Sequence, residues 1–179
     1  MTDNATIIAE RQQDVIESRI LAWVDEAIEL RFGGEGDDNG VLDPATVDFN
    51  SNLSIMLMLE RVRIRETRVD GLLIEAMRAQ AKAKRAAKSL AFQSQTQYAE
   101  SMRVAADRRR EYVSADELKA EANLGSLEER RKTYQAERLL AVADEAVDVI
   151  KQISYQFNRW RNDLLEMSKA RRAETMLDR

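Results

Sequence analysis

The sequence predicts an all-α protein: a long antiparallel helical hairpin of coiled-coil type, preceded by an N-terminal amphipathic helix and an acidic linker. Turn-forming residues are scarce, because the 179 residues include one proline, Pro44, and six glycines, four of them within 33–40. The strong helix formers Ala, Glu, Arg, Leu, Lys and Gln dominate the rest. Apolar residues recur at steps of three and four, and no run shows the period of two that a strand needs.

The N-terminal region, 1–32, is expected to hold an amphipathic helix over about residues 5–31. Its apolar face consists of Ile16, Ile20, Trp23, Ala27 and Ile28. Residues 33–52 are expected to form an acidic, glycine-rich linker, which begins with GGEGDDNGVLD at 33–43. Asp43 and Pro44 suit a helix start, but Asn50 and Asn52 soon interrupt it, so only a turn or a short helix is expected there.

The region 53–179 is expected to form the hairpin, with nucleic-acid binding and oligomerisation assigned to it. Its first helix should run from about Leu53 to about Arg110, and its returning helix from about Leu127 to about Glu174. Both carry heptad seams of apolar residues at steps of three and four. The first seam is Ile55, Met58, Val62, Arg65, Val69, Leu72, Ala76, Ala79, Ala83, Ala86 and Leu90. The second is Ala136, Leu139, Ala143, Ala146, Ile150, Ile153, Phe157, Trp160, Leu164 and Met167.

Two capping boxes are expected where the chain reverses, Ser114 with Glu117 and Ser126 with Glu129. A short helix over about 115–123 should lie between them and end at Asn123 and Gly125. A turn there would set the alanines of 76–86 against the large residues Ile150, Ile153, Phe157 and Trp160.

The returning helix is also apolar off its seam, at Leu140, Val142, Val147 and Val149. A two-helix hairpin would leave these side chains in water, so we expect the N-terminal helix with Trp23, or a second subunit, to cover them. Two long helices also make a thin core, which favours a homo-oligomer.

Charge is distributed unevenly along the chain. The net charge is −4, but residues 1–50 carry 3 basic and 12 acidic side chains, whereas residues 51–110 carry 13 and 6. The absence of cysteine and histidine excludes disulfides, thiolate metal sites and histidine catalysis. No apolar window is long enough to span a membrane and no signal peptide is evident, so a cytoplasmic location is expected.

A stretch without acidic residues, from Ala76 to Ala99, carries the functional prediction. Cations followed by an aromatic ring suit single-stranded nucleic acid, because phosphates contact the charges while bases stack on the ring. The alternative is a solvated helix face that pairs with the acidic N-terminal arm. The candidate nucleic-acid-binding residues are Arg78, Lys82, Lys84, Arg85, Lys88 and Phe92, with Arg108, Arg109 and Arg110 as a second cluster near the turn.

Motifs for catalysis, cofactors and metals are missing. There is no phosphate-binding GxxxxGK, no GxGxxG and no GxSxG, so we expect no enzyme and no cofactor. The linker matches a calcium loop at Glu35, Asp37 and Asn39, but the position for the bidentate glutamate is Thr46. We therefore expect no metal site.

Residues 75–165 resemble the UvsY-type recombination mediators of tailed phages. The resemblance rests on a basic helix (78–110), then SADELKAEANLGSLEE (114–129), then YQAERLLAVADEAVDVIKQISYQFNRW (134–160). Asn162 follows Trp160 and Arg161 where that family often has phenylalanine. The resemblance implies a ring-forming protein that binds single-stranded DNA and helps a RecA-type recombinase replace single-strand-binding protein, in the host cytoplasm if phage-encoded. The competing hypothesis is a coiled-coil structural protein, such as a phage scaffold or an assembly chaperone, without nucleic-acid binding.

Overall fold

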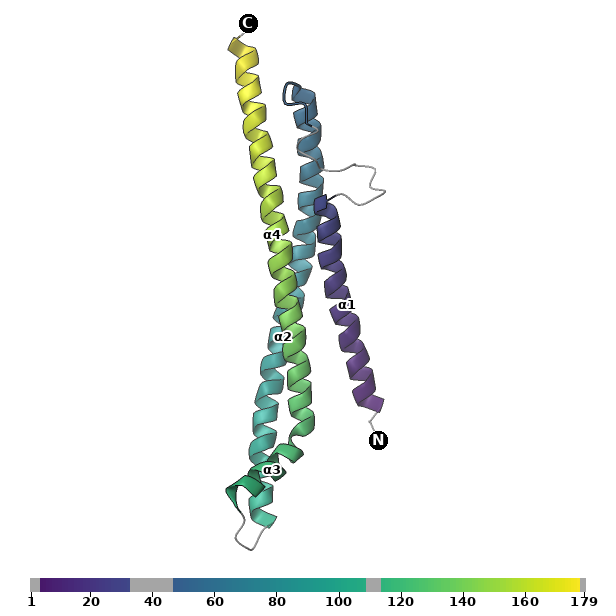
Figure 1. Cartoon of the computed structure of the whole chain (residues 1–179), viewed down its shortest axis with the longest axis vertical. Coiled ribbons are helices and arrows are strands. Elements are labelled where there is room, and N and C mark those ends of the chain that lie inside the picture. Colours follow the sequence, from purple (N-terminus) through teal and green to yellow (C-terminus); the bar gives the residue numbers. More distant parts are fainter. Residues whose placement is uncertain (1–3, 33–46, 109–113, 178–179) are drawn as a thin grey trace. The chain divides into compact units, whose positions relative to one another are not determined.

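The computed structural model describes residues 4–32, 47–108 and 114–177, and these ranges form four α-helices without a strand (Figure 1). The helices are α1 (Asn4–Phe32), α2 (Asn52–Arg108), α3 (Ala115–Gly125) and α4 (Leu127–Leu177). The all-α prediction is confirmed, and each helix lies within a few residues of its expected bounds. Asp43 and Pro44 lie outside the described residues.

Helix α2 begins at a serine cap that the sequence analysis did not single out. The Ser51 hydroxyl accepts a hydrogen bond from the Ser54 amide at 3.2 Å, and the Ser54 hydroxyl accepts one from the Asp48 amide at 3.1 Å. The first bond satisfies an amide group that the start of the helix leaves without a partner, and the second ties the preceding residues to the first turn.

The chain divides into two compact units, each of which contains part of α2 and part of α4. Unit 1 combines residues 1–77 with 145–179, and unit 2 consists of residues 78–144. In both units α2 and α4 pack against each other in opposite directions, which is the predicted helical hairpin.

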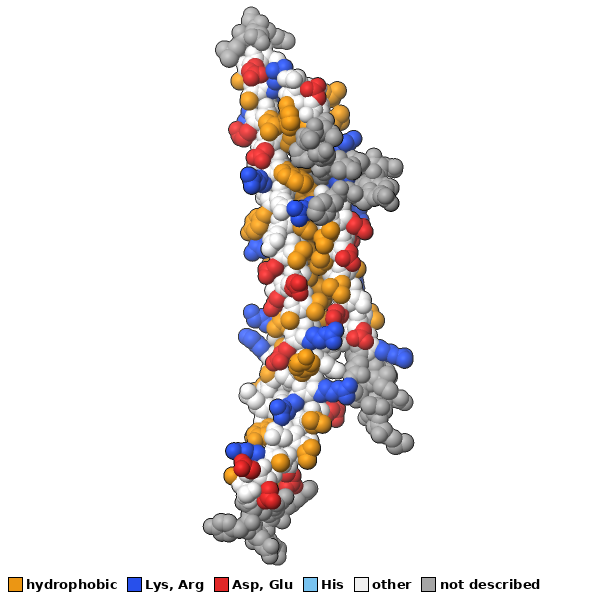
Figure 2. Space-filling view, viewed as in Figure 1, with side chains coloured by type: hydrophobic (Ala, Val, Ile, Leu, Met, Phe, Trp, Pro, Cys, Tyr) orange, Lys and Arg blue, Asp and Glu red, His pale blue; other side chains and the backbone are white. Residues whose placement is uncertain are grey.

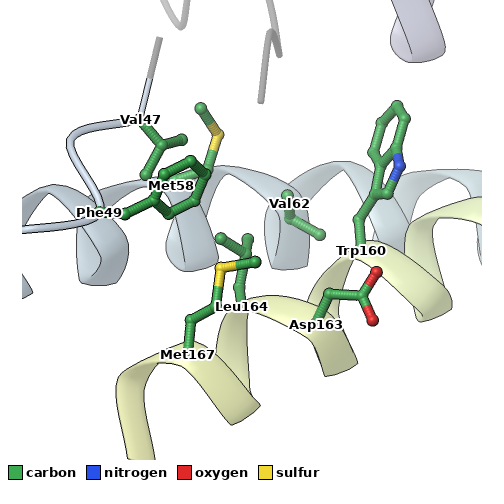
Figure 3. A pocket seen from close by; sticks show the side chains of 8 residues that line it. All are labelled: Val47, Phe49, Met58, Val62, Trp160, Asp163, Leu164 and Met167. Atoms are coloured by element: carbon green, nitrogen blue, oxygen red, sulfur yellow. The ribbon is translucent and has the colours of Figure 1, made fainter. Parts of the chain in front are cut away.

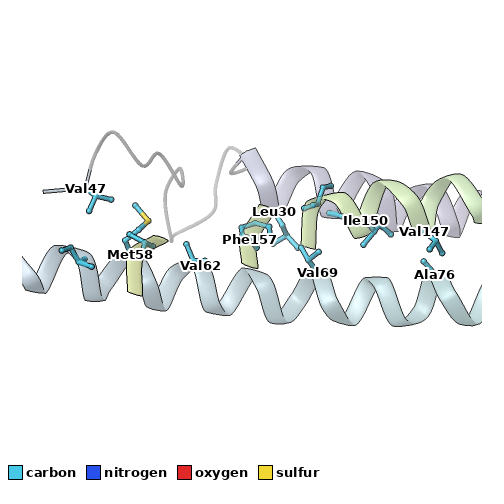
Figure 4. Close-up of a cluster of buried hydrophobic side chains, with 13 residues drawn as sticks. Leu30, Val47, Met58, Val62, Val69, Ala76, Val147, Ile150 and Phe157 are labelled. Carbon is cyan, nitrogen blue, oxygen red and sulfur yellow. The ribbon is translucent and has the colours of Figure 1, made fainter. Parts of the chain in front are cut away.

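The hydrophobic core of unit 1 lies where α1, α2 and α4 meet (Figure 4). Phe157 and Ile150 of α4 are fully buried, as are Val69 and Ala76 of α2. Val147 and Val149, which lie off the α4 seam, belong to this cluster, and Trp23 and Ala27 of α1 pack with it. The N-terminal helix therefore covers Val147 and Val149, in agreement with the first of the two expected arrangements. Leu140 and Val142 belong to unit 2, where they are half-buried.

Two arginines of α2 attach α1 to the hairpin. Arg65 is buried within the α2 seam, and its Nη1 donates to the Leu30 carbonyl oxygen at 3.2 Å. This carbonyl is in the last turn of α1, where helix carbonyls have no intrahelical partner and favour a cation. Arg68 Nε also donates to Glu26 Oε1 at 2.7 Å.

The expected apolar face of α1 is partly wrong. Ile20, Trp23 and Ala27 are buried or half-buried as predicted, but Ile16 and Ile28 are exposed. Leu30 is buried in place of Ile28, because the contact with α2 continues along the side of α1 that carries Ala27.

The register of α2 against α4 differs from the expected one. In unit 1 the Ser154 hydroxyl donates to Asp70 Oδ1 at 2.7 Å, and in unit 2 Gln80 Nε2 donates to Asp144 Oδ1 at 2.9 Å. The alanines of 76–86 therefore face residues of about 138–148, and the expected pairing with Phe157 and Trp160 is wrong. Phe157 belongs instead to the cluster that contains Val62 and Val69.

The α2 seam also changes its period in unit 2. Ala86, expected in the seam, is exposed, and Ala87 is buried instead. The inward positions from Ala83 onward step by four and seven through Ala87, Ser94, Tyr98 and Ala105, all of them buried or half-buried. An 11-residue repeat corresponds to about 3.67 residues per turn, slightly more than the roughly 3.6 of a straight α-helix, whereas a heptad corresponds to about 3.5.

Only the first of the two expected capping boxes forms at the turn. The Ser114 hydroxyl accepts from the Glu117 amide at 3.3 Å, and the Glu117 carboxylate accepts from the Ser114 amide at 3.2 Å. The box of Ser126 with Glu129 is wrong, because Ser126 is buried and its hydroxyl donates to the Ala122 carbonyl at 3.0 Å. Ser126 alone separates α3 from α4.

Gly125 is the last residue of α3, and Ser126 follows it as the C-cap. A Cβ at Gly125 would lie 2.8 Å from Ser101 Oγ and 3.2 Å from Ser101 Cβ. Glycine at this position therefore lets α3 approach α2 closely inside unit 2.

Candidate nucleic-acid interface

The candidate interface lies in unit 2 on the part of α2 that follows Met77. The small side chains of Ala83 and Ala87 are buried against α4, so the long cationic side chains on the other sides of α2 project outward. Arg78, Lys82, Arg85 and Phe92 follow one stripe of the helix, and about 21 Å separates the first from the last at 1.5 Å per residue. All six predicted residues from Arg78 to Phe92 are exposed: Arg78, Lys82, Lys84, Arg85, Lys88 and Phe92.

Most of these cations are not neutralised by the surrounding protein. Within the described part of the chain, Lys82, Lys84, Arg85 and Lys88 make no ion pair and no side-chain hydrogen bond. Asp144 of unit 2, which lies on the facing helix, is bonded to Gln80 instead. For Lys82, Lys84, Arg85 and Lys88, the alternative of pairing with the acidic arm is not seen among the described residues, and the linker at 33–46 lies outside them.

An aromatic ring and a series of amides continue the row of cations. The Phe92 side chain is 70% exposed, and Gln93 and Gln95 beside it are exposed too. A bare aromatic ring on a charged helix has no packing role in the described structure, but it can stack on a nucleobase.

Tyr134 of α4 is a residue that the sequence analysis missed. Its side chain is also 70% exposed, and the register set by Gln80 and Asp144 places it level with Phe92 along unit 2. The residue could not be found from its own helix, because only the pairing of α2 with α4 brings the two rings to one level.

The structure describes only part of the second basic cluster. Arg108 is the last residue of α2, and Arg109 and Arg110 lie outside the described residues. On the returning helix, Arg130 Nη1 donates to Asn123 Oδ1 at 2.9 Å. Lys132 Nζ lies 2.7 Å from Glu128 Oε1, and this hydrogen bond raises the pKa of Lys132 and lowers the pKa of Glu128. Arg130 and Lys132 are therefore already engaged locally.

The surface of the helices mixes both signs of charge (Figure 2). On the face shown, Lys and Arg side chains project among Asp and Glu side chains, with apolar side chains visible between them. The acid-free part of α2 is distinct because its own sequence supplies no carboxylate from Ala76 to Ala99.

Unit 1 contains an apolar pocket of about 220 Å³ (Figure 3). Trp160 forms part of its wall, half-buried rather than enclosed, with its ring edge-on to Phe157 at a centroid distance of 5.5 Å. Asp163 is the one charged residue of the described lining, so the pocket holds no pair of groups for acid–base chemistry. The lining is Val47, Phe49, Met58, Val62, Trp160, Asp163, Leu164 and Met167.

Among the described residues, acidic side chains nowhere gather in a group of three or more that could hold a metal ion. In the same ranges, no helix combines the length and the apolar character needed to cross a membrane. Comparison of the chain with protein-family models, with curated proteins and with solved structures finds no match.

Proposed function

We propose that this chain is a non-enzymatic recombination mediator, which binds single-stranded DNA and helps to load a RecA-type recombinase. The observation that carries the proposal is the row of exposed cations Lys82, Lys84, Arg85 and Lys88, which have no ion-pair partner in the described chain. Cations that are solvated rather than paired can release counterions from a polyanion without first breaking contacts within the protein.

The arrangement supports a single strand rather than a duplex as the ligand. Phosphates of an extended strand would contact the stripe from Arg78 to Arg85, and an unstacked base would lie on the exposed ring of Phe92. In a duplex the bases are stacked on each other and offer no free face to that ring. Phosphate contacts fix position without reading sequence, so the proposed binding is sequence-independent.

The loading step is proposed from the resemblance to UvsY-type mediators. A mediator needs to hold the strand without chemistry, so that single-strand-binding protein is displaced and the recombinase can take its place. The absence of histidine and cysteine from the sequence agrees with such a role.

Binding is tested with a fluorescein-labelled oligothymidine by anisotropy over a series of salt concentrations. We expect binding at low salt that weakens linearly in a plot of log K against log salt, with weaker binding to a duplex of the same length. No binding to single-stranded DNA at low salt would overturn the proposal. The chain would then be interpreted as a coiled-coil structural or assembly protein, for which the packed seams of α2 and α4 already suffice.

The loading role needs a separate test. A RecA-type recombinase hydrolyses ATP slowly on DNA that is covered by single-strand-binding protein, so a mediator should shorten the lag before hydrolysis begins. A chain that binds DNA but leaves this lag unchanged is a single-strand-binding protein and no mediator.

A further inference from the structure

Helix α2 carries a second apolar face within unit 1, on the side opposite its buried seam. Its central positions step by four and three, as in a heptad repeat, and four of the seven carry large apolar side chains. These positions are Leu53, Leu57, Glu60, Ile64, Thr67, Gly71 and Ile74. Its large side chains are open to solvent, with Leu57 57% exposed and Ile64 52% exposed. Ile74, Met56 and Met77 on the same side are exposed as well. An apolar stripe of this length on a helix is typical of a protein interface.

Gly71 lies in the centre of this face, and no contact among the described residues explains it. Glycine within a helix is less favourable than alanine. A Cβ at Gly71 would meet no atom within 4 Å, in contrast to Gly125, where Ser101 is close. The space beside Gly71 is thus available to something outside this chain.

We propose that this face of α2 binds the same face of a second copy of the chain, with the two helices antiparallel about a two-fold axis. In this register Leu57 lies against Ile74 of the second copy, and Ile64 lies against Thr67. Glu60 of the second copy then lies over Gly71, where the missing side chain leaves room for it. By symmetry each contact occurs twice, so the face is complementary to itself.

The flanking charges select the antiparallel orientation. Antiparallel packing sets Arg63 beside Asp70 of the second copy and Met56 beside Met77, which are favourable contacts. Parallel packing would set Arg63 beside Arg68 and Asp70 beside Glu75, which are two like-charge pairs. The cost of the antiparallel pairing is Arg61 beside Arg68, but Arg68 is already neutralised by Glu26 at 2.7 Å.

Cysteine cross-linking tests the orientation directly, because the chain has no cysteine of its own. We expect a mixture of Leu57→Cys and Ile74→Cys chains to form an oxidised dimer, while neither variant does so alone. A dimer from Leu57→Cys alone would indicate parallel helices and overturn the proposal. No cross-link in the mixture would overturn it as well.

The surface itself is tested by light scattering and sedimentation without nucleic acid, so the result is separate from the proposed DNA binding. Ile64→Glu should weaken association at least tenfold without unfolding the chain, because Ile64 is half-exposed. Val104→Glu is the matched control, since Val104 is an exposed apolar residue of α2 outside this face, and it should have no effect. Equal association of the Ile64→Glu variant and the original protein would show that copies meet elsewhere or not at all.

The charge pair gives the last test. Arg63→Glu and Asp70→Arg should each weaken association, and the double variant should restore most of it. Ser154→Ala is the control for Asp70, because it removes the intrachain hydrogen bond of that carboxylate without changing the charge. Failure of the double variant to recover, with both single variants folded, would contradict the antiparallel register.

Discussion

Arg161 Nη1 lies 2.8 Å from Oε1 and 2.9 Å from Oε2 of Glu66, and this contact joins α4 to α2 at a buried carboxylate. The Glu66 side chain is only 8% exposed, whereas Arg161 reaches the surface at 36%. A carboxylate this deeply placed depends on its cation, because burial of an unpaired charge is costly.

Arg161→Met should therefore lower the free energy of unfolding by about 2–3 kcal/mol, since it leaves Glu66 buried without its partner. Chemical denaturation followed by circular dichroism measures this change. The double variant Glu66→Met with Arg161→Met should recover part of the loss. Equal stability of the Arg161→Met variant and the original protein would mean that water reaches the carboxylate.

Two glycines should respond in opposite ways to alanine. At a protein concentration too low for association, Gly71→Ala should raise the free energy of unfolding by about 0.5–1 kcal/mol, because in the single chain the new methyl group enters open space and the helix is favoured. Gly125→Ala should lower it by about 1–3 kcal/mol, because the methyl group would meet Ser101. Thermal melts at one protein concentration compare the two. Ser101→Ala should reduce the harm of Gly125→Ala, and a lack of such rescue would argue against the close approach.

Neighbouring alanines of α2 should tolerate leucine unequally. Ala83 is 4% exposed against α4, so Ala83→Leu should cost about 1–3 kcal/mol through overpacking. Ala86 faces solvent, so Ala86→Leu should change stability by less than about 0.5 kcal/mol. A larger loss of stability from Ala86→Leu than from Ala83→Leu would indicate that Ala86 is buried, as the heptad seam expected from the sequence requires.

Removal of the three stripe cations should affect the salt dependence of DNA binding. Changing Arg78, Lys82 and Arg85 to alanine removes up to three phosphate contacts, so the slope of log K against log salt should flatten by about 2 per chain. Anisotropy titrations with oligothymidine measure this slope. The matched control changes Arg11, Arg159 and Arg172, which are exposed cations of unit 1, and should leave the slope nearly intact.

The exposed rings should contribute in a different manner. Phe92→Ala should weaken binding by about 1–3 kcal/mol if a base stacks on the ring, and the salt slope should stay the same. Tyr134→Ala tests whether the second ring, at the same level of unit 2, takes part. Tyr155 is an exposed tyrosine of unit 1, and its change to alanine should leave DNA affinity unchanged. Unchanged affinity of Phe92→Ala would limit binding to the phosphate contacts.

The number, order and approximate bounds of the helices could be predicted from the sequence, since they depend on local signals. The capping box of Ser114 with Glu117 is one such signal, and the scarcity of glycine and proline after residue 44 is another. The outward direction of Lys82 and Arg85 follows from the helical period alone.

The pairing of α2 with α4 could not be predicted, because heptad seams match themselves again after a slip of seven residues. Apolar residues face apolar residues in several such alignments, so the seam alone does not choose between them. The choice is made by polar pairs such as Glu66 with Arg161 and Asp70 with Ser154, and by the close approach at Gly125. These depend on residues far apart in the chain, and they also decide that Tyr134 is level with Phe92.

The small size of the buried side chains in unit 2 has a consequence for local opening. Its fully buried residues are alanines and Ser126, whereas unit 1 buries Phe157, Ile150, Ile55 and Val62. Unit 2 therefore buries less apolar surface area per helical turn than unit 1 does. Its backbone amides should exchange with deuterium through fluctuations of lower free energy than the amides around Phe157. In the segment that carries the candidate DNA contacts, α2 and α4 should therefore separate more readily than in unit 1. A bound polyanion should slow the deuterium exchange of the backbone amides there.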